Sequence, residues 1–137
     1  MTSSLYKNLK LFSVVGVLLV LSACAANTPK ASSIEERAMA RWDKLLSGDL
    51  AGAYEYLSPG FRSSVSSIQY QRSILLKRVR WTDAKYLDSE CDESSCKVSI
   101  NLGYNVSGAL PGVKSFDGKQ DIVETWILSD GVWYLVP

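Results

Sequence analysis

The sequence predicts an α+β domain in which N-terminal helices pack on a curved antiparallel sheet. Two observations predict it. Apolar residues recur at helical spacing until about residue 77, and from residue 79 onward they alternate with a period of two. Helices therefore come first and strands follow without alternating with them, an order typical of helices laid on one face of an antiparallel sheet.

Two short helices are predicted at the start of the domain. A capping box formed by Ser32 and Glu35 marks the start of the first, which Gly48 ends. Asp49 has the side chain to cap the second, and the turn residues Ser58-Pro59-Gly60 would stop it. The expected inward positions of both helices are Ile34, Ala38, Trp42, Leu45, Leu50, Ala53, Tyr54 and Leu57.

A third helix is predicted from Ser67 to Lys77. Its spacing favours Ile68, Gln71, Ile74 and Leu75 as the inward positions. After this helix the period of the apolar pattern changes to two.

Four strands follow and predict an antiparallel meander. The first runs from Val79 to Glu90, and the second alternates from Cys96 to Val106. The third is Asp121 to Leu128, and Ser129-Asp130-Gly131 makes a tight turn into the fourth, Val132 to Val136.

The segment Ser107 to Lys119, between the second and third strands, is predicted as a loop. Hairpin loops usually have about 2 to 5 residues, so this one is long, and its glycines and Pro111 indicate a shaped tip. Leu110 and Val113 are candidate residues for contact with a partner protein. The alternative is an exposed loop without a function.

Cys91 and Cys96 are predicted to form a disulfide across the neck of a hairpin. The four residues between them, Asp92-Glu93-Ser94-Ser95, have turn chemistry. A metal or redox pair is the weaker alternative, because the chain has no histidine and the spacing is not Cys-x-x-Cys.

At the N-terminus, Lys7 and Lys10 precede an uncharged stretch that ends in Leu21-Ser22-Ala23-Cys24. This arrangement resembles a bacterial lipoprotein signal peptide with its lipobox. The apolar stretch is shorter than the ~20 residues that a membrane-spanning helix needs. A plain secretory signal cut near Cys24 is the alternative.

The lipobox resemblance implies cleavage before Cys24 and acylation of that cysteine. Several acyl chains, each contributing about 0.8 kcal/mol per buried methylene, would anchor the chain stably in the membrane of the cell envelope. Ala25 then implies the periplasmic side of the outer membrane, if the organism has two membranes. The expected organisation is a signal peptide at 1–23, a lipidated tether at 24–33 and a domain at 34–137.

Composition excludes several classes of function. The chain has 15 Lys and Arg against 14 Asp and Glu, so no general attraction to nucleic acid is expected. No glycine-rich phosphate loop and no metal-ligand cluster is present, and we expect no cofactor. A serine nucleophile would lack its histidine.

Two stretches of the domain carry a family pattern: residues 42–62, WDKLLSGDLAGAYEYLSPGFR, and residues 131–136, GVWYLV. With them the domain resembles small nuclear transport factor 2-like domains. The resemblance covers about residues 34–137 and implies a cone whose sheet and helices enclose a pocket. Members of this family act as isomerases, dehydratases, ligand binders or assembly modules, so the resemblance implies a fold more than an activity. It also implies a homodimer through the outer face of the sheet as one arrangement.

Glu124 and Asp83 are the candidate catalytic residues. Glu124 shares strand parity with Ile122 and Trp126, so it would be desolvated and its pKa raised, as a general base requires. The alternative places Glu124 on the solvent face of the sheet or near its edge. Trp126 and Tyr104 are candidates for lining a ligand pocket, although such aromatic residues are usually core.

The sequence favours a lipid-anchored periplasmic module that binds a partner protein or a small apolar ligand without catalysis. One alternative is a small isomerase-like or dehydratase-like enzyme that uses a carboxylate in the cone. Another is a structural accessory of an envelope machine that uses the loop Ser107 to Lys119.

Overall fold

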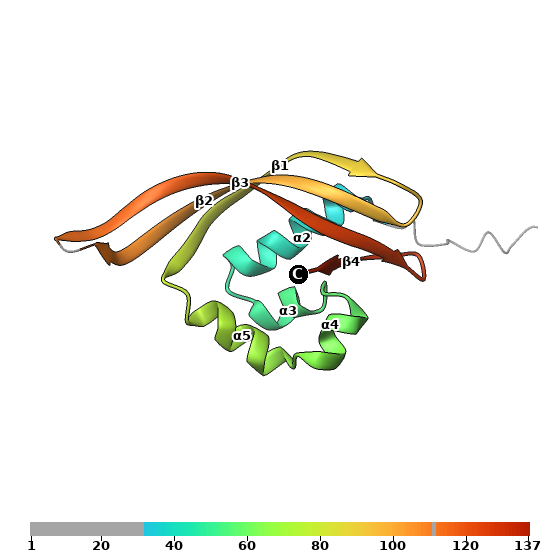
Figure 1. Cartoon of the computed structure of the whole chain (residues 1–137), viewed down its shortest axis with the longest axis horizontal. Coiled ribbons are helices and arrows are strands. Elements are labelled where there is room, and N and C mark those ends of the chain that lie inside the picture. The colour runs from blue at the N-terminus through green and yellow to red at the C-terminus, as the bar shows by residue number, and fades with distance from the viewer. Residues whose placement is uncertain (1–31, 111) are drawn as a thin grey trace, which may run out of the picture. The chain divides into compact units, whose positions relative to one another are not determined.

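The computed structural model describes residues 32–110 and 112–137, which form four helices against a four-stranded antiparallel sheet (Figure 1). The predicted signal peptide, Cys24 and most of the tether lie outside the described residues. The predicted α+β class, with helices on one face of the sheet, is confirmed. Among the described helices, none is long and apolar enough to span a membrane.

The first two helices begin at polar caps. Helix α2 (Ile34–Leu46) is capped by Ser33, whose hydroxyl accepts a hydrogen bond from the amide of Glu36 while the Glu36 carboxylate accepts one from the Ser33 amide. The capping box thus starts one residue later than predicted. Helix α3 (Leu50–Tyr54) is capped by Asp49, as predicted.

Helix α4 (Pro59–Ser64) was not predicted from the sequence. Helix α3 already ends at Tyr54, so Ser58-Pro59-Gly60 do not stop it as predicted; they start a new helix instead. The Ser58 hydroxyl accepts from the Phe61 amide at 3.3 Å, and Pro59 lies in the first turn, where its missing N–H has no helical partner to lose.

Helix α5 (Ser67–Leu75) has a different inner face from the one predicted. Tyr70 is buried, whereas Ile68 and Leu75 are 70% and 73% exposed. The reason is that α5 packs on α3 through an aromatic contact, with the rings of Tyr54 and Tyr70 centred 5.7 Å apart. This contact leaves Ile68 and Leu75 exposed, whereas Ile74 is half-buried against the core, as predicted.

The strands form the predicted meander. They are β1 (Val79–Cys91), β2 (Ser95–Leu110), β3 (Val113–Ser129) and β4 (Val132–Val136), and they lie in the order β1-β2-β3-β4. The turn between β3 and β4 has positive φ at both Asp130 and Gly131, as tight hairpin turns favour.

The prediction of a loop from Ser107 to Lys119 is wrong, because the pairing of β2 with β3 continues into this segment. Val106 pairs with Phe116 and Ser107 with Ser115, and after an irregularity Leu110 pairs with Val113. The Asn105 side-chain amide donates to the Asp117 carboxylate at 2.9 Å, so polar residues hold the strands together there. This part of β2 and β3, from Tyr104 to Gly118, is called the arm; it extends beyond the helices (Figure 1).

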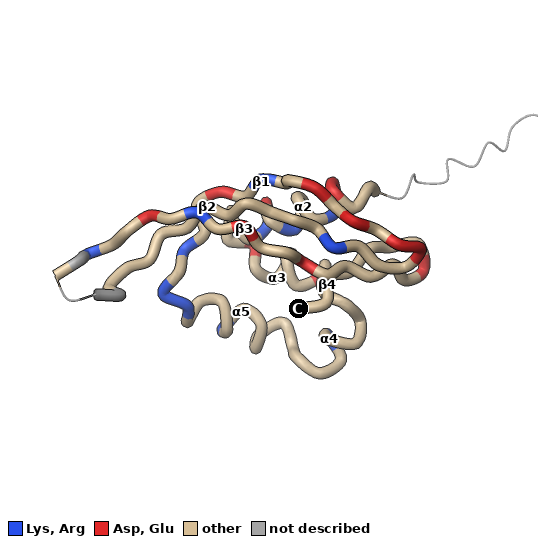
Figure 2. Tube along the Cα trace, turned by 45° about the horizontal axis from the view of Figure 1, so that its top comes forward, with Lys and Arg blue, Asp and Glu red and all other residues tan. Residues whose placement is uncertain are grey.

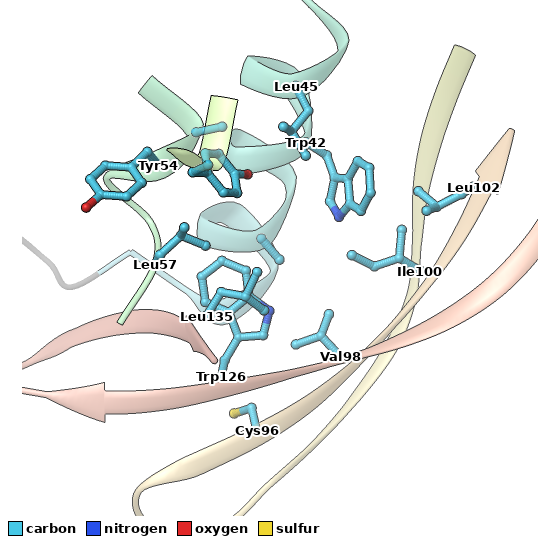
Figure 3. Packing of buried hydrophobic residues seen from close by; sticks show 13 residues of the cluster. Trp42, Leu45, Tyr54, Leu57, Cys96, Val98, Ile100, Leu102, Trp126 and Leu135 are labelled. Carbon is cyan, nitrogen blue, oxygen red and sulfur yellow. The ribbon is translucent and has the colours of Figure 1, made fainter. Parts of the chain in front are cut away.

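The core lies between the helices and the inner face of the sheet (Figure 3). Strand β4 closes it, because Leu135 donates to the Tyr56 carbonyl and accepts from the Ser58 amide, both at 2.8 Å. Residues Ala31–Pro137 form one compact unit that contains this whole core. Its buried apolar residues are Ala38, Trp42, Leu45, Ala53, Tyr54, Leu57, Tyr70, Cys96, Val98, Ile100, Leu102, Trp126 and Leu135.

The predicted disulfide between Cys91 and Cys96 is present and joins β1 to β2. The two residues face each other in the register, with their Cα atoms 4.0 Å apart. The turn between them is held by the Asp92 carboxylate, which accepts from the amides of Ser94 and Ser95.

Candidate functional site

A cleft of about 700 Å³ lies between helices α2 and α5 and strands β3 and β4. Aromatic and aliphatic side chains make most of its wall, and a buried ion pair lies among them. The lining residues that matter below are Arg41, Trp42, Tyr70, Lys77, Ile122 and Glu124.

Arg41 of α2 and Glu124 of β3 form the ion pair. The Arg41 Nη1 atom donates to Glu124 Oε1 at 2.8 Å, and only 9% and 7% of the two side chains are exposed. The second carboxylate oxygen, Oε2, accepts from the indole Nε1 of Trp126 at 3.0 Å. Both oxygens of Glu124 therefore have a protein donor.

Burial raises the pKa of the Glu124 carboxyl above its ordinary value, because desolvation disfavours the charged form. The positive charge of Arg41 and the hydrogen bond from Trp126 act in the opposite direction but do not cancel this effect. The carboxylate is held by its partners in an environment that penalises its charge.

Two further donors near this pair have no partner. They are Nε of Arg41 and Nε1 of Trp42, both buried. The Trp42 indole lies close enough to Glu124 to act toward a lower pKa of its carboxyl, although the geometry is not that of a hydrogen bond. In Figure 3 the nitrogens of Trp42 and Trp126 face the space between the two rings. The ion pair therefore lies in a region with more donors than acceptors.

The mouth of the cleft also carries a cation. Lys77 places its ammonium 5.8 Å from the centre of the Trp81 ring, and Trp81 packs edge-on against Trp42 with ring centres 5.4 Å apart. On the other side of the ion pair, Nη2 of Arg41 donates to the Tyr70 hydroxyl at 3.4 Å. Together these contacts fix the aromatic wall around Arg41.

The local sequence explains how both charged residues come to face inward. On α2, Arg41 follows Ala38 by three residues and precedes Leu45 by four, so it lies on the same apolar stripe. On β3, Glu124 alternates with Ile122 and Trp126 on the inner face of the sheet. Arg41 was not predicted as a site residue. The signal that could have identified it is an arginine on the apolar stripe of a helix, combined with a glutamate on the apolar face of a strand.

Asp83 does not line the cleft. Its carboxylate lies over Gly103, so close that a Cβ atom at position 103 would clash with it. Gly103 alternates with the inward-facing Leu102 and thus lies on the outer face of the sheet. Asp83 and Glu124 are therefore on opposite faces.

The other candidate residues are also spread over the domain. Tyr104 packs over Gly118 at the base of the arm and lines a separate small hollow with Phe116. Trp126 is fully buried beneath the cleft and supports Glu124. Leu110 and Val113 are register partners at the tip of the arm.

Among residues 32–110 and 112–137, no group of three or more Cys, Asp or Glu side chains is arranged to hold a metal ion. The chain has no histidine.

Comparison with known proteins informs the fold alone. No protein-family model matches the chain. No curated protein matches it either. A solved structure with a similar fold is the solution structure of a SEC-C motif containing protein from Rhodopseudomonas palustris, with a TM-score of 0.61. The two are 15% identical, and the match covers 78% of this chain and 77% of the other.

Proposed function

We propose that this chain is a lipoprotein of the bacterial envelope, anchored through Cys24, whose domain binds a small apolar ligand in the cleft without catalysis. The lipobox-like sequence Leu21-Ser22-Ala23-Cys24 supports the anchor and the periplasmic location. The α+β architecture, with a hollow between helices and sheet, supports a nuclear transport factor 2-like cone as the domain type.

The hydrogen bonds of the Glu124 carboxylate are the main support for binding without catalysis. A general base needs a lone pair directed at the proton that it removes. Here one oxygen accepts from Arg41 and the other from Trp126, so protein donors fix the orientation of the carboxylate and occupy one acceptor site on each oxygen. The paired charges instead give the cleft a floor without net charge.

The walls of the cleft favour an apolar ligand with one polar group that accepts hydrogen bonds. Trp42, Phe61, Trp81 and Ile122 supply apolar surface. Lys77 supplies an ammonium near the mouth, and the buried donors beside Glu124 outnumber the acceptors. A hydroxyl, carbonyl or carboxylate on the ligand would match these donors.

Native mass spectrometry of the full chain, purified from membranes of its own organism in mild detergent, tests this proposal. We expect a small molecule to remain bound to the wild-type protein. Ser73→Trp adds an indole inside the cleft and should abolish the adduct, because Ser73 lines the cleft from α5. Ile68→Trp is the matched control, since Ile68 is on the same helix and 70% exposed. An unliganded wild-type protein, or equal loss in both variants, would contradict the proposal.

A second candidate function is a small isomerase-like or dehydratase-like enzyme. The raised pKa of Glu124 favours it, because a general base needs such a pKa. The same preparations distinguish the two functions. A binding module would yield the same molecule from wild type and from Glu124→Gln, although in different amounts. An isomerase-like or dehydratase-like enzyme would accumulate its substrate in the variant, visible as a species with a different mass or chromatographic retention time.

A further inference from the structure

The junction between α5 and β1 carries exposed leucines among basic side chains. Leu75 and Leu76 are 73% and 76% exposed, and Val79 is 38% exposed. Four basic residues lie beside them and are also exposed: Arg72, Lys77, Arg78 and Arg80. We call Arg72 together with residues 75–80 the α5–β1 patch.

The α5–β1 patch lies in a stretch of the chain that has no acidic residue. Between Glu55 and Asp83 the sequence contains no Asp or Glu. Among the described residues, none of the four basic side chains of the patch is in an ion pair with a carboxylate. Figure 2 shows the basic positions at the end of α5 and the start of β1, whereas acidic positions are frequent on the hairpin of β1 and β2. The patch therefore presents uncompensated positive charge.

We propose that the α5–β1 patch docks on the surface of a bilayer that contains anionic lipids. Leucine side chains that project into solvent can enter the boundary between headgroups and acyl chains, where their burial is favourable. Lys and Arg side chains beside them would lie near lipid phosphates, and each such contact strengthens binding about five-fold, which corresponds to about 1 kcal/mol.

A hollow next to the patch supports a lipid as the occupant. It measures about 360 Å³ and is lined by aliphatic residues such as Leu50 and Ile74 together with Lys77 and Arg80. An apolar wall combined with two cations suits a molecule that has both an acyl part and an anionic headgroup. Leu75 lines this hollow, whereas Leu76 is 76% exposed and is not part of its wall. A leucine that projects beside an apolar hollow favours a bilayer over an acidic protein.

This inference does not depend on the proposed ligand of the cleft or on acylation of Cys24. The patch is distant in sequence from the lipobox and belongs entirely to the compact unit Ala31–Pro137. If both proposals hold, the anchor and the patch are two membrane signals that act together and orient the domain.

Co-sedimentation of residues 31–137 with vesicles tests the charge requirement. This unit carries the whole core, so it can be used without the anchor. We expect it to bind vesicles of phosphatidylcholine mixed with phosphatidylglycerol and to bind pure phosphatidylcholine at least ten-fold more weakly. Arg72→Gln with Arg80→Gln should weaken binding to the mixed vesicles about five-fold for each charge removed.

The control for charge is Lys85→Gln with Lys97→Gln, which removes the same net charge from exposed positions outside the patch. This variant should retain binding within about two-fold of wild type, since charges far from the bound surface contribute little across a Debye length. Equal losses in the two double variants would overturn the proposal, because binding would then follow net charge alone.

Leu75→Ser with Leu76→Ser tests the apolar contribution and should weaken binding at least ten-fold. Leu87→Ser, at a 45% exposed position of β1, is its control and should bind like wild type. Circular dichroism would establish that each variant is folded. If folded wild-type protein does not bind mixed vesicles, or binds both vesicle types equally, the anionic bilayer is not the occupant.

Discussion

Arg41 and Glu124 meet in a part of the domain where their side chains are largely shielded from solvent. Less than a tenth of either side chain is exposed. Removing two charges from water costs several kcal/mol for each ion, and their mutual attraction offsets this only when the remaining donors and acceptors are satisfied. Here Trp126 and Tyr70 supply additional partners, but Nε of Arg41 has none. The pair is therefore better suited to defining a binding surface than to stabilising the fold.

Arg41→Met should lower the free energy of unfolding by about 3–5 kcal/mol, because it leaves Glu124 buried without its counter-charge. Adding Glu124→Leu should recover part of this loss, because no buried charge is then left without a partner; the Trp126 indole, which loses its acceptor, keeps the double variant about 1–3 kcal/mol below wild type. Urea unfolding of residues 31–137 measures both. A loss below about 1 kcal/mol in the single variant would mean that Glu124 is solvated.

The stability of the domain should also depend on pH through Glu124. The pKa of Glu124 is raised in the folded state above its ordinary value of 4.5. At a pH between the ordinary pKa and the folded-state pKa, the folded protein therefore holds a proton that the unfolded chain has released. The contribution of Glu124 to stability is thus present at low pH and is lost as pH rises through the folded pKa. The free energy of unfolding of wild type minus that of Glu124→Gln should decline from pH 4 toward pH 7.

Using this difference removes the effect of other carboxylates. The pKa values of Asp49 and Asp92 are lowered by hydrogen bonds to their side chains, which gives the opposite dependence on pH. Both proteins share these residues, so their contributions cancel. A difference that is flat or rises with pH would contradict the burial of an unfavourable charge at Glu124.

The sequence pattern predicted that Glu124 faces inward, but it did not predict that Arg41 is buried. Strand parity with Ile122 and Trp126 predicts an inward Glu124, because alternation has only two outcomes. An arginine such as Arg41 is ordinarily assigned to solvent, and only a partner distant in the chain makes its burial tolerable. Such a pairing depends on how the helix lies on the sheet, which local spacing does not specify.

The hairpin of β1 and β2 is stabilised by two devices, the Cys91–Cys96 disulfide and the Asp92 turn. Cys91→Ser opens the disulfide at its exposed end, whereas Cys96 is buried in the core. Because the closed loop is very short, we expect a loss of about 2 kcal/mol in the free energy of unfolding. Urea unfolding of residues 31–137 without reductant measures it.

The domain should remain folded in Cys91→Ser, because the Asp92 carboxylate still accepts from the amides of Ser94 and Ser95. Removing both devices, with Asp92→Ala added, should cost more than either change alone. Complete unfolding of the single variant at neutral pH would mean that the disulfide, and not the turn, sets the register of the two strands.

The sequence predicted best those elements whose turn or cap residues lie next to each other in the chain. The turn at Asp130 and Gly131 and the cap at Asp49 depend on residues within a few positions, and both are as expected. The predictions for the arm and for Ile68 and Leu75 of α5 were wrong, because each depends on distant contacts. Asn105 needs Asp117 across the sheet, and α5 is turned by the contact of Tyr70 with Tyr54.

The helices and the sheet are joined into one unit by the last strand. Leu135 of β4 makes a parallel bridge to Leu57, and Arg37 of α2 donates to the Trp133 carbonyl at 3.1 Å. The cleft lies beside this closure, and the α5–β1 patch lies where the helical layer passes into the sheet. With an anchor at Cys24, the tether of about eight residues would reach at most about 30 Å. The domain would then work close to the membrane surface.

Acylation of Cys24 underlies the proposed location and role of the whole molecule. The intact mass of the protein isolated from the membranes of its own organism tests it most directly. We expect the mass of residues 24–137 with a diacylglyceryl group on Cys24, with or without an acyl chain on its amine, less two hydrogens for the Cys91–Cys96 disulfide. A mass without lipid, or a chain that retains residues 1–23, would contradict it.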